Sequence, residues 1–151
     1  MMDEIELTRE LIRINSENPP GREKELAFFV RDYIQDNLKE MEAEVVRVDS
    51  KRYNTVAYLN GEPDGLMLNG HLDTVPTGSL DLWTQDPFSG EIVDEKLYGR
   101  GACDMKGAIA CMLTATRNVL SQKEKPLEKK LLLALWQKLA LLEENYQRGL
   151  H

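Results

Sequence analysis

The sequence is poor in cysteine and basic residues and has no long apolar run, and each shortage excludes a class of protein. Only Cys103 and Cys111 are available among 151 residues, which gives no disulfide framework and favours a reduced, cytoplasmic protein. No apolar stretch approaches the roughly 18 residues of a membrane span. With 19 Lys and Arg against 26 Asp and Glu, the net charge is −7, which argues against nucleic acids and anionic membranes as partners.

The remaining composition is that of an ordinary globular chain. Hydrophobic residues make up 42% and charged residues 30% of the sequence, which excludes a disordered or collagen-like protein. The first six residues are acidic where a signal peptide would be basic, so we do not expect secretion. Because no repeat, low-complexity tract or linker is visible, the length predicts a single domain.

Hydrophobic periodicity predicts an alternation of helices and strands. The expected helices are 3–14, 22–41 and 104–121. The expected strands are 45–48, 54–59, 66–68 and 91–98, of which the third reads as buried, and 74–90 is an irregular loop. The end of the chain fits both a strand and a helical stripe, and we place a strand at 130–136 before a helix at 137–147.

The first segment with chemical potential is GHLDTVP, residues 70–76, at the end of an expected strand. Neutral imidazole is a good zinc ligand, and its second nitrogen needs an acceptor that fixes the tautomer. Residues i and i+2 of a strand point to the same side, so His71 and Asp73 can cooperate as ligand and orienting carboxylate. Taken alone, the pair also fits an ordinary packing or surface role.

The second segment is LYGRGACDMKG, residues 97–107, in which glycines surround an acidic residue at a helix start. Glycines let the backbone approach a metal or ligand closely. Asp104 is therefore a candidate ligand, although, taken alone, this motif favours a role as N-cap of the helix. Cys103 beside it is either a thiolate ligand or a small buried hydrophobe.

Together with WTQDPFSG at residues 83–90, these two segments resemble the co-catalytic zinc family of acetylornithine deacetylases, succinyl-diaminopimelate desuccinylases, aminoacylases and glutamate carboxypeptidases. The resemblance extends over about residues 5–135 and rests on three motifs in the family's order. It implies that His71 binds one zinc, that Asp73 is the catalytic carboxylate orienting His71, and that Asp104 bridges two zincs. Trp83 and Phe88 either line the rim of the site or anchor the long loop.

The resemblance also implies a fold and an activity. The expected fold is α/β, a three-layer sandwich whose mixed, mostly parallel sheet is flanked by helices, as part of a zinc exopeptidase-like catalytic domain. Residues 1–151 would form an incomplete catalytic domain without the lid or dimerisation domain and without the C-terminal half. The implied activity is hydrolysis of N-acyl amino acids or small peptides with zinc, cobalt or manganese as the metal.

The sequence departs from the family after the last expected strand. The family has a Glu-Glu pair there, a general base and a zinc ligand, whereas this chain has Trp136–Ala140. Glu143 and Glu144 come later in a helical context, and His151 is a poor substitute for the family's distant histidine. A frameshift near residue 136 and an internal deletion rejoining near 141–148 are both compatible with this pattern.

The departure leaves three functional hypotheses. The first is a metal-dependent amidohydrolase present as a fragment that is inactive alone, and the second is a non-catalytic remnant or binding module with the same fold. The third is a generic α/β domain in which His71 and Asp104 are structural. An incomplete sheet also leaves an exposed edge strand, so we expect self-association.

Overall fold

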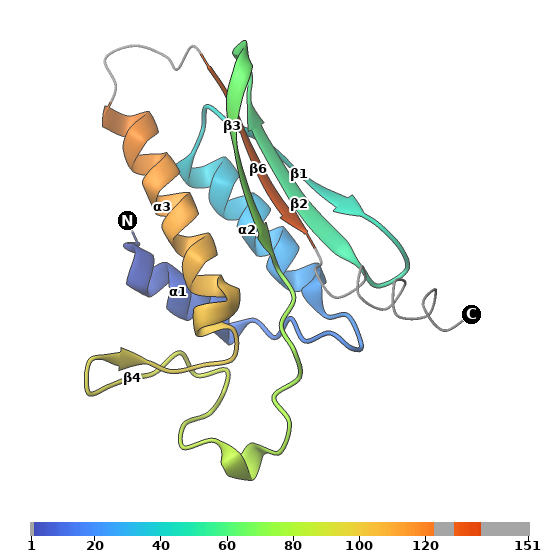
Figure 1. Ribbon diagram of the computed structural model, residues 1–151, viewed down its shortest axis with the longest axis vertical. Coiled ribbons are helices and arrows are strands. Elements are labelled where there is room, and N and C mark those ends of the chain that lie inside the picture. The colour runs from blue at the N-terminus through green and yellow to red at the C-terminus, as the bar shows by residue number, and fades with distance from the viewer. Residues whose placement is uncertain (1, 123–128, 137–151) are drawn as a thin grey trace.

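The computed structural model describes residues 2–122 and 129–136. Three helices pack beside a four-stranded sheet, and a long loop with a small hairpin extends from one end (Figure 1). The helices are α1 (Glu4–Arg13), α2 (Glu23–Asn37) and α3 (Gly107–Gln122). The strands are β1 (Glu42–Arg47), β2 (Tyr53–Leu59), β3 (Glu62–His71), β4 (Ile92–Val93), β5 (Lys96–Leu97) and β6 (Lys129–Trp136). None of the described helices is long and apolar enough to cross a lipid bilayer.

The helices follow the apolar stripes of the sequence. The side chain of Asp3 caps α1 by accepting a hydrogen bond from the backbone N–H of Glu6, and the stripe of α1 buries Leu7 and Leu11. In α2 the stripe continues past the helix end at Asn37, because Leu38 stays buried although its backbone is no longer helical. The apolar period therefore marks the core more accurately than the helix boundary.

The sheet is mixed, with strand order β1-β2-β6-β3. The α/β class is confirmed, but the expected predominance of parallel pairs does not hold for the described strands. β1 pairs antiparallel with β2, and β2 pairs antiparallel with β6, whereas β3 and β6 pair in parallel. A short connection between β1 and β2 permits only antiparallel pairing, while the parallel partners are joined through the crossover helix α3.

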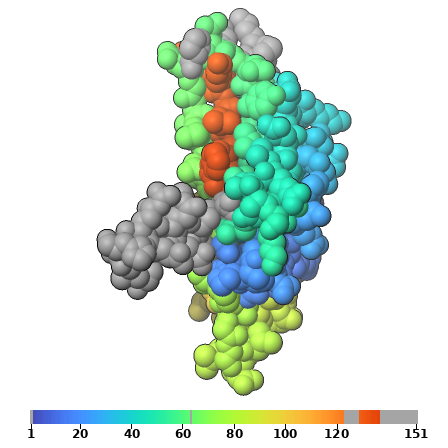
Figure 2. Space-filling view, turned by 90° about the vertical axis from the view of Figure 1, so that its right-hand side faces the viewer, coloured from blue at the N-terminus to red at the C-terminus, as the bar shows by residue number. Residues whose placement is uncertain are grey.

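The described helices cover one face of this sheet. Leu131, Leu133 and Leu135 of β6 are buried in the core, as the expected strand at 130–136 requires. Figure 2 shows the opposite face, where β6 lies between β3 and β2 without a described helix over it. The described residues thus supply two of the three layers that we expected, and the expected helix at 137–147 lies outside them.

Two strands differ from their sequence-based descriptions. The strand expected as buried at 66–68 is part of the edge strand β3, and Leu66 and Met67 are 59% and 57% exposed. The strand expected at 91–98 is instead the hairpin β4–β5. Asp94 and Glu95 form its tight turn with φ of 48° and 60°, the left-handed conformation that a two-residue hairpin turn demands.

Candidate metal site

The strand β3 delivers the first two candidate residues to one end of the sheet. His71 is its last residue and pairs with Trp136 of the parallel strand β6, and the chain then continues through the buried Leu72 to Asp73. Asp73 is buried, with 1% of its surface exposed. Since the carboxyl ends of parallel strands lie at the same edge, this edge is where an α/β sheet places ligand-binding groups.

Asp104 reaches the same place from the other motif. Its carboxylate Oδ1 lies 2.8 Å from Nε2 of His71, although the two residues are 33 positions apart in the sequence. The N-cap alternative for Asp104 is wrong, because α3 begins only at Gly107, three residues further along the chain. The Asp104 side chain is 75% exposed, so the carboxylate faces the solvent side of the site.

The second ring nitrogen of His71, Nδ1, lies close to two acceptors of Asp73, its backbone carbonyl and its carboxylate. Nδ1 lies 2.8 Å from the backbone carbonyl of Asp73 and 3.4 Å from its carboxylate Oδ1. The backbone carbonyl is therefore the closer acceptor, whereas we expected the carboxylate. Asp73 and then Asp104 raise the pKa of His71, and partial burial of the ring opposes them. A metal ligand must be neutral imidazole, so a raised pKa makes protonation of His71 compete with metal binding up to a higher pH.

Behind Asp73 lies a buried charge cluster that the sequence analysis missed. Asn18 donates a hydrogen bond of 3.1 Å to Oδ2 of Asp73, and a guanidinium nitrogen of Arg52 lies 3.8 Å from the same oxygen. Arg52 also donates to Glu23 at 2.9 Å, and the Glu23 side chain is completely buried. Burial raises the pKa of Glu23 while Arg52 opposes the rise. These residues come from three separate segments, and no local pattern links them.

The segment that follows α1 forms hydrogen bonds with both motifs, residues 70–76 and residues 97–107. The N–H of Thr74 donates to the carbonyl of Ser16 at 3.0 Å, and the N–H of Asn18 donates back to the carbonyl of Thr74 at 2.8 Å. From the second motif, the Lys106 ammonium donates to the carbonyl of Ile14 at 2.7 Å. Lys106 is fully buried, and this burial lowers its pKa to about 7. Lys106 was not among the expected site residues, and its place two residues after Asp104 is the sequence signal that points to it.

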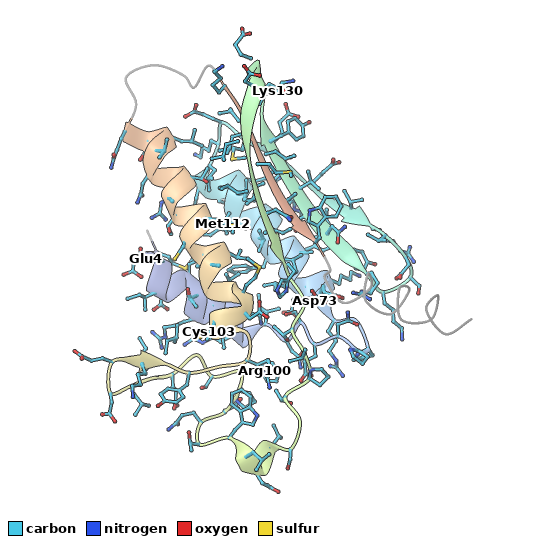
Figure 3. All side chains as sticks on the ribbon, in the orientation of Figure 1. Glu4, Asp73, Arg100, Cys103, Met112 and Lys130 are labelled. Atoms are coloured by element: carbon cyan, nitrogen blue, oxygen red, sulfur yellow. The ribbon has the colours of Figure 1, made fainter. Side chains whose placement is uncertain are left out.

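Residues of the two motifs surround a cavity of about 550 Å³. Its lining includes His71, Asp73, Trp83, Arg100, Cys103 and Asp104. Figure 3 shows Asp73, Arg100 and Cys103 around this region, on the chain between the end of β3 and the start of α3. Cys103 is an exposed thiol, so its alternative as a buried hydrophobe is wrong.

Trp83 both lines the cavity and anchors the long loop, the two roles that we considered for it. Phe88 is not part of the cavity lining. The Trp83 ring lines the cavity, and its indole N–H donates to the carbonyl of Thr77 at 3.0 Å, which anchors the long loop. A neighbouring carbonyl on the same loop, that of Asp86, accepts from the Ser89 hydroxyl at 2.8 Å.

The donor set fits part of a metal site. His71 Nε2 and Asp104 Oδ1 converge, and an imidazole nitrogen with a carboxylate oxygen suits zinc and neighbouring divalent ions. Within residues 2–122 and 129–136, no group of three or more His, Cys, Asp or Glu side chains is placed to hold a metal ion. Zinc sites in proteins use three or four protein ligands. Glu143, Glu144 and His151 lie outside the described residues.

Comparison with known proteins identifies the relatives of this arrangement. Residues 67–136, which contain both motifs, match the model of peptidase family M20/M25/M40. A succinyl-diaminopimelate desuccinylase of Wolbachia pipientis wMel is 38% identical over 125 residues, covering 81% of this chain and 30% of that relative. A succinyl-diaminopimelate desuccinylase of Methylorubrum extorquens is 63% identical over 51 residues, covering 34% of this chain and 13% of that relative.

Solved structures show the same fold. An M20 family metallo-carboxypeptidase from Sulfolobus solfataricus superimposes with a TM-score of 0.81 at 22% identity, covering 100% of this chain and 36% of that one. The fold shared with this structure is an α/β domain, and in this chain it brings His71 and Asp104 together. By sequence the chain resembles peptidase family M20/M25/M40 and succinyl-diaminopimelate desuccinylases, as the motifs predicted. It spans about 30% of the length of the first of these relatives.

Proposed function

We propose that this chain carries part of the catalytic site of a metal-dependent amidohydrolase that acts on N-acyl amino acids or small peptides. The observation that carries the proposal is the 2.8 Å approach of His71 Nε2 to Asp104 Oδ1 at the mouth of the cavity. The likeness to succinyl-diaminopimelate desuccinylases supports amide-bond hydrolysis as the reaction. Divalent metal ions, when bound, lower the pKa of a water molecule and polarise a substrate carbonyl.

In this proposal the chain's own residues prepare the site. His71 and Asp104 are metal ligands, and Asp73 fixes the orientation of His71 by accepting from Nδ1 through its backbone carbonyl. Asn18 and Arg52 hold the Asp73 carboxylate in turn. The general base is not among the described residues, and removing a general base costs about 100-fold or more in rate. We therefore expect little hydrolysis by this chain alone.

A second candidate function is a non-catalytic binding module with the same fold. Trp136 ends β6 next to His71, at the position where the family's acidic pair would begin, and this observation favours the module. Both candidates retain a cavity beside His71, so metal binding does not separate them. Turnover of an N-succinyl or N-acetyl amino acid by the metal-loaded chain does: hydrolysis faster than that by the free metal ion, even at the low rate expected without the general base, supports the enzyme, and a rate equal to that of the free metal ion supports the module.

Metal binding itself is tested by titrating the chain with Co²⁺, whose absorption spectrum reports coordination, and by measuring Zn²⁺ content after dialysis. We expect His71→Ala to weaken binding more than about tenfold, since even residues that only orient a ligand contribute about 10- to 100-fold. The matched control is His151→Ala, because His71 and His151 are the two histidines of the chain. Equal loss in both variants, or none in either, contradicts the assignment of His71.

We also propose that the edge strand β3 mediates self-association with a second copy of the chain. Leu66 and Met67 expose apolar surface on an edge strand, and such edges pair with other strands. Leu66→Lys is therefore expected to shift the chain toward the monomer in sedimentation velocity across a concentration series. Leu82→Lys is the matched control, since Leu82 is 85% exposed in the loop away from the edge. Identical distributions for the two variants would exclude β3 as the contact.

The cytoplasmic location remains a prediction. It is supported by the two free thiols, Cys103 and Cys111, both of which are exposed.

A further inference from the structure

Arg100 is the arginine of the cavity lining, and the metal site does not use its guanidinium group. Its backbone is held tightly, because its N–H donates to the carbonyl of Pro87 at 2.7 Å and glycines flank it on both sides. A Cβ on Gly99 would come within 2.4 Å of Ile12, and one on Gly101 within 2.6 Å of Thr74. The close packing of these two glycines fixes where Arg100 enters the cavity.

The guanidinium of Arg100 is positioned by an aromatic ring. Its central carbon lies 4.9 Å from the centroid of the Trp83 ring, and Trp83 is itself anchored to the carbonyl of Thr77. Arg100 reaches the same carbonyl only at 3.5 Å, and its buried Nε has no hydrogen-bond partner among the described residues. Stacking on an indole favours one orientation of the planar guanidinium and leaves its edge available for hydrogen bonds.

No carboxylate of the described residues forms an ion pair with Arg100, in contrast to Arg52, which contacts Glu23 and Asp73. A guanidinium offers five donors in a fixed fork that matches a carboxylate. In a cavity lined by the acidic Asp73 and Asp104, a cation without an acidic partner is suited to an anionic group that arrives with a ligand.

We infer that Arg100, stacked on Trp83, is a subsite for a carboxylate group of the substrate, separate from the metal ligands. The inference rests on the proposed function for the kind of substrate, because N-acyl amino acids and N-succinyl compounds carry such a carboxylate. Arg100 would then select acidic substrates and hold them in the cavity that His71 and Asp104 line. Neutral amides of the same shape would lack this contact.

The test measures carboxylate binding to the metal-free full chain, so that it does not depend on metal or turnover. The variant Trp136→Phe leaves Trp83 as the single tryptophan, and its fluorescence then reports on the stacked guanidinium. We expect N-acetylglycine to cause a saturable change and neutral N-acetylglycinamide to cause little. In this background, Arg100→Gln should weaken N-acetylglycine binding at least about tenfold, the scale of a charge-assisted hydrogen bond.

Arg31→Gln is the matched control, because Arg31 stacks on Phe28 at 4.8 Å outside the cavity and its loss removes the same charge. Arg100→Lys keeps the charge without the fork and should retain part of the affinity, which keeps the test informative if Arg100→Gln fails to fold. Equal binding by the control and Arg100→Gln overturns the inference, as does equal binding of the acid and the neutral amide. Tighter binding of inorganic phosphate than of N-acetylglycine also overturns it.

These results are distinguishable from failure of the proposed function. If His71→Ala leaves Co²⁺ binding unchanged but Arg100→Gln abolishes N-acetylglycine binding, the metal assignment fails and the carboxylate subsite stands. If metal binds at His71 and Arg100→Gln has no effect on N-acetylglycine binding, the subsite is wrong and the metal assignment stands.

Discussion

Replacing Arg52 with methionine is expected to destabilise the protein by about 3–5 kcal/mol, the usual cost of removing one partner from a buried ion pair. Arg52 is the cation between Glu23 and Asp73, whose side chains are completely buried, and the Arg52 side chain itself is only 11% exposed. Without it, buried Glu23 loses its ion-pair partner, and Asp73 keeps only its neighbours on the other side, among them Asn18 and His71. The free energy of unfolding from urea denaturation at neutral pH measures the effect.

The pH dependence of this variant gives an independent check. Burial already raises the pKa of Glu23 in the presence of Arg52, and losing the cation removes its charge and its hydrogen bond, which both oppose the rise alongside the backbone hydrogen bond of Glu23. A carboxyl group with a raised pKa in the folded state gains stability when it is protonated, so the deficit of Arg52→Met should shrink as the pH falls from neutral toward 5. A deficit that stays constant over this range would indicate lost packing rather than unpaired charge.

Two controls separate charge from side-chain removal. Arg47→Met removes an exposed arginine next to the same turn, and we expect a change within about 0.5 kcal/mol. Glu23→Gln combined with Arg52→Met removes one of the two carboxylates together with the cation, so it should recover part of the loss. If Arg52→Met costs no more than Arg47→Met, the cluster does not support Asp73 as we describe.

The motif residues illustrate what sequence reasoning can reach. His71 and Asp104 lie far apart in the chain, yet each follows a recognisable local pattern, one at the end of a strand and one before a helix with small residues. Parallel pairing of β3 with β6 through α3 then brings these two loops to one edge. Their proximity follows from topology, whereas their roles as metal ligands stay predictions.

The supporting residues could not be found in the same way. Glu23, Arg52 and Asn18 show no shared spacing, because the contacts that matter join a helix start, a turn and a loop across the sheet end. The exposure of β3 was missed for a related reason. An apolar run such as Leu66–Leu68 indicates a strand, but its position at a sheet edge depends on which strands pair beside it.

Lys106 is expected to make the free energy of unfolding increase with pH, and Lys106→Met should remove this contribution. Burial lowers the pKa of Lys106 to about 7, whereas a lysine in the unfolded chain keeps its proton to about pH 10.4. Between these values the unfolded state binds one more proton than the folded state, so the free energy of unfolding increases with pH. From pH 7 to 9 this contribution is about 2 kcal/mol, at 1.36 kcal/mol for each unit.

The experiment compares wild type with Lys106→Met by urea denaturation at several values of pH, since the difference cancels all other titrations. We expect the methionine variant to be favoured most below pH 7, where the wild type must bury a charge, and to lose that advantage toward pH 9. Neutral Lys106 still donates to the carbonyl of Ile14, so the wild type keeps its link between α1 and the second motif at high pH. Lys96→Met, at an exposed lysine in β5, should give a flat difference. A flat difference for Lys106→Met as well would mean that Lys106 remains charged in the folded protein, and that its hydrogen bond to Ile14 and the charge of Glu17 together outweigh the effect of burial on its pKa.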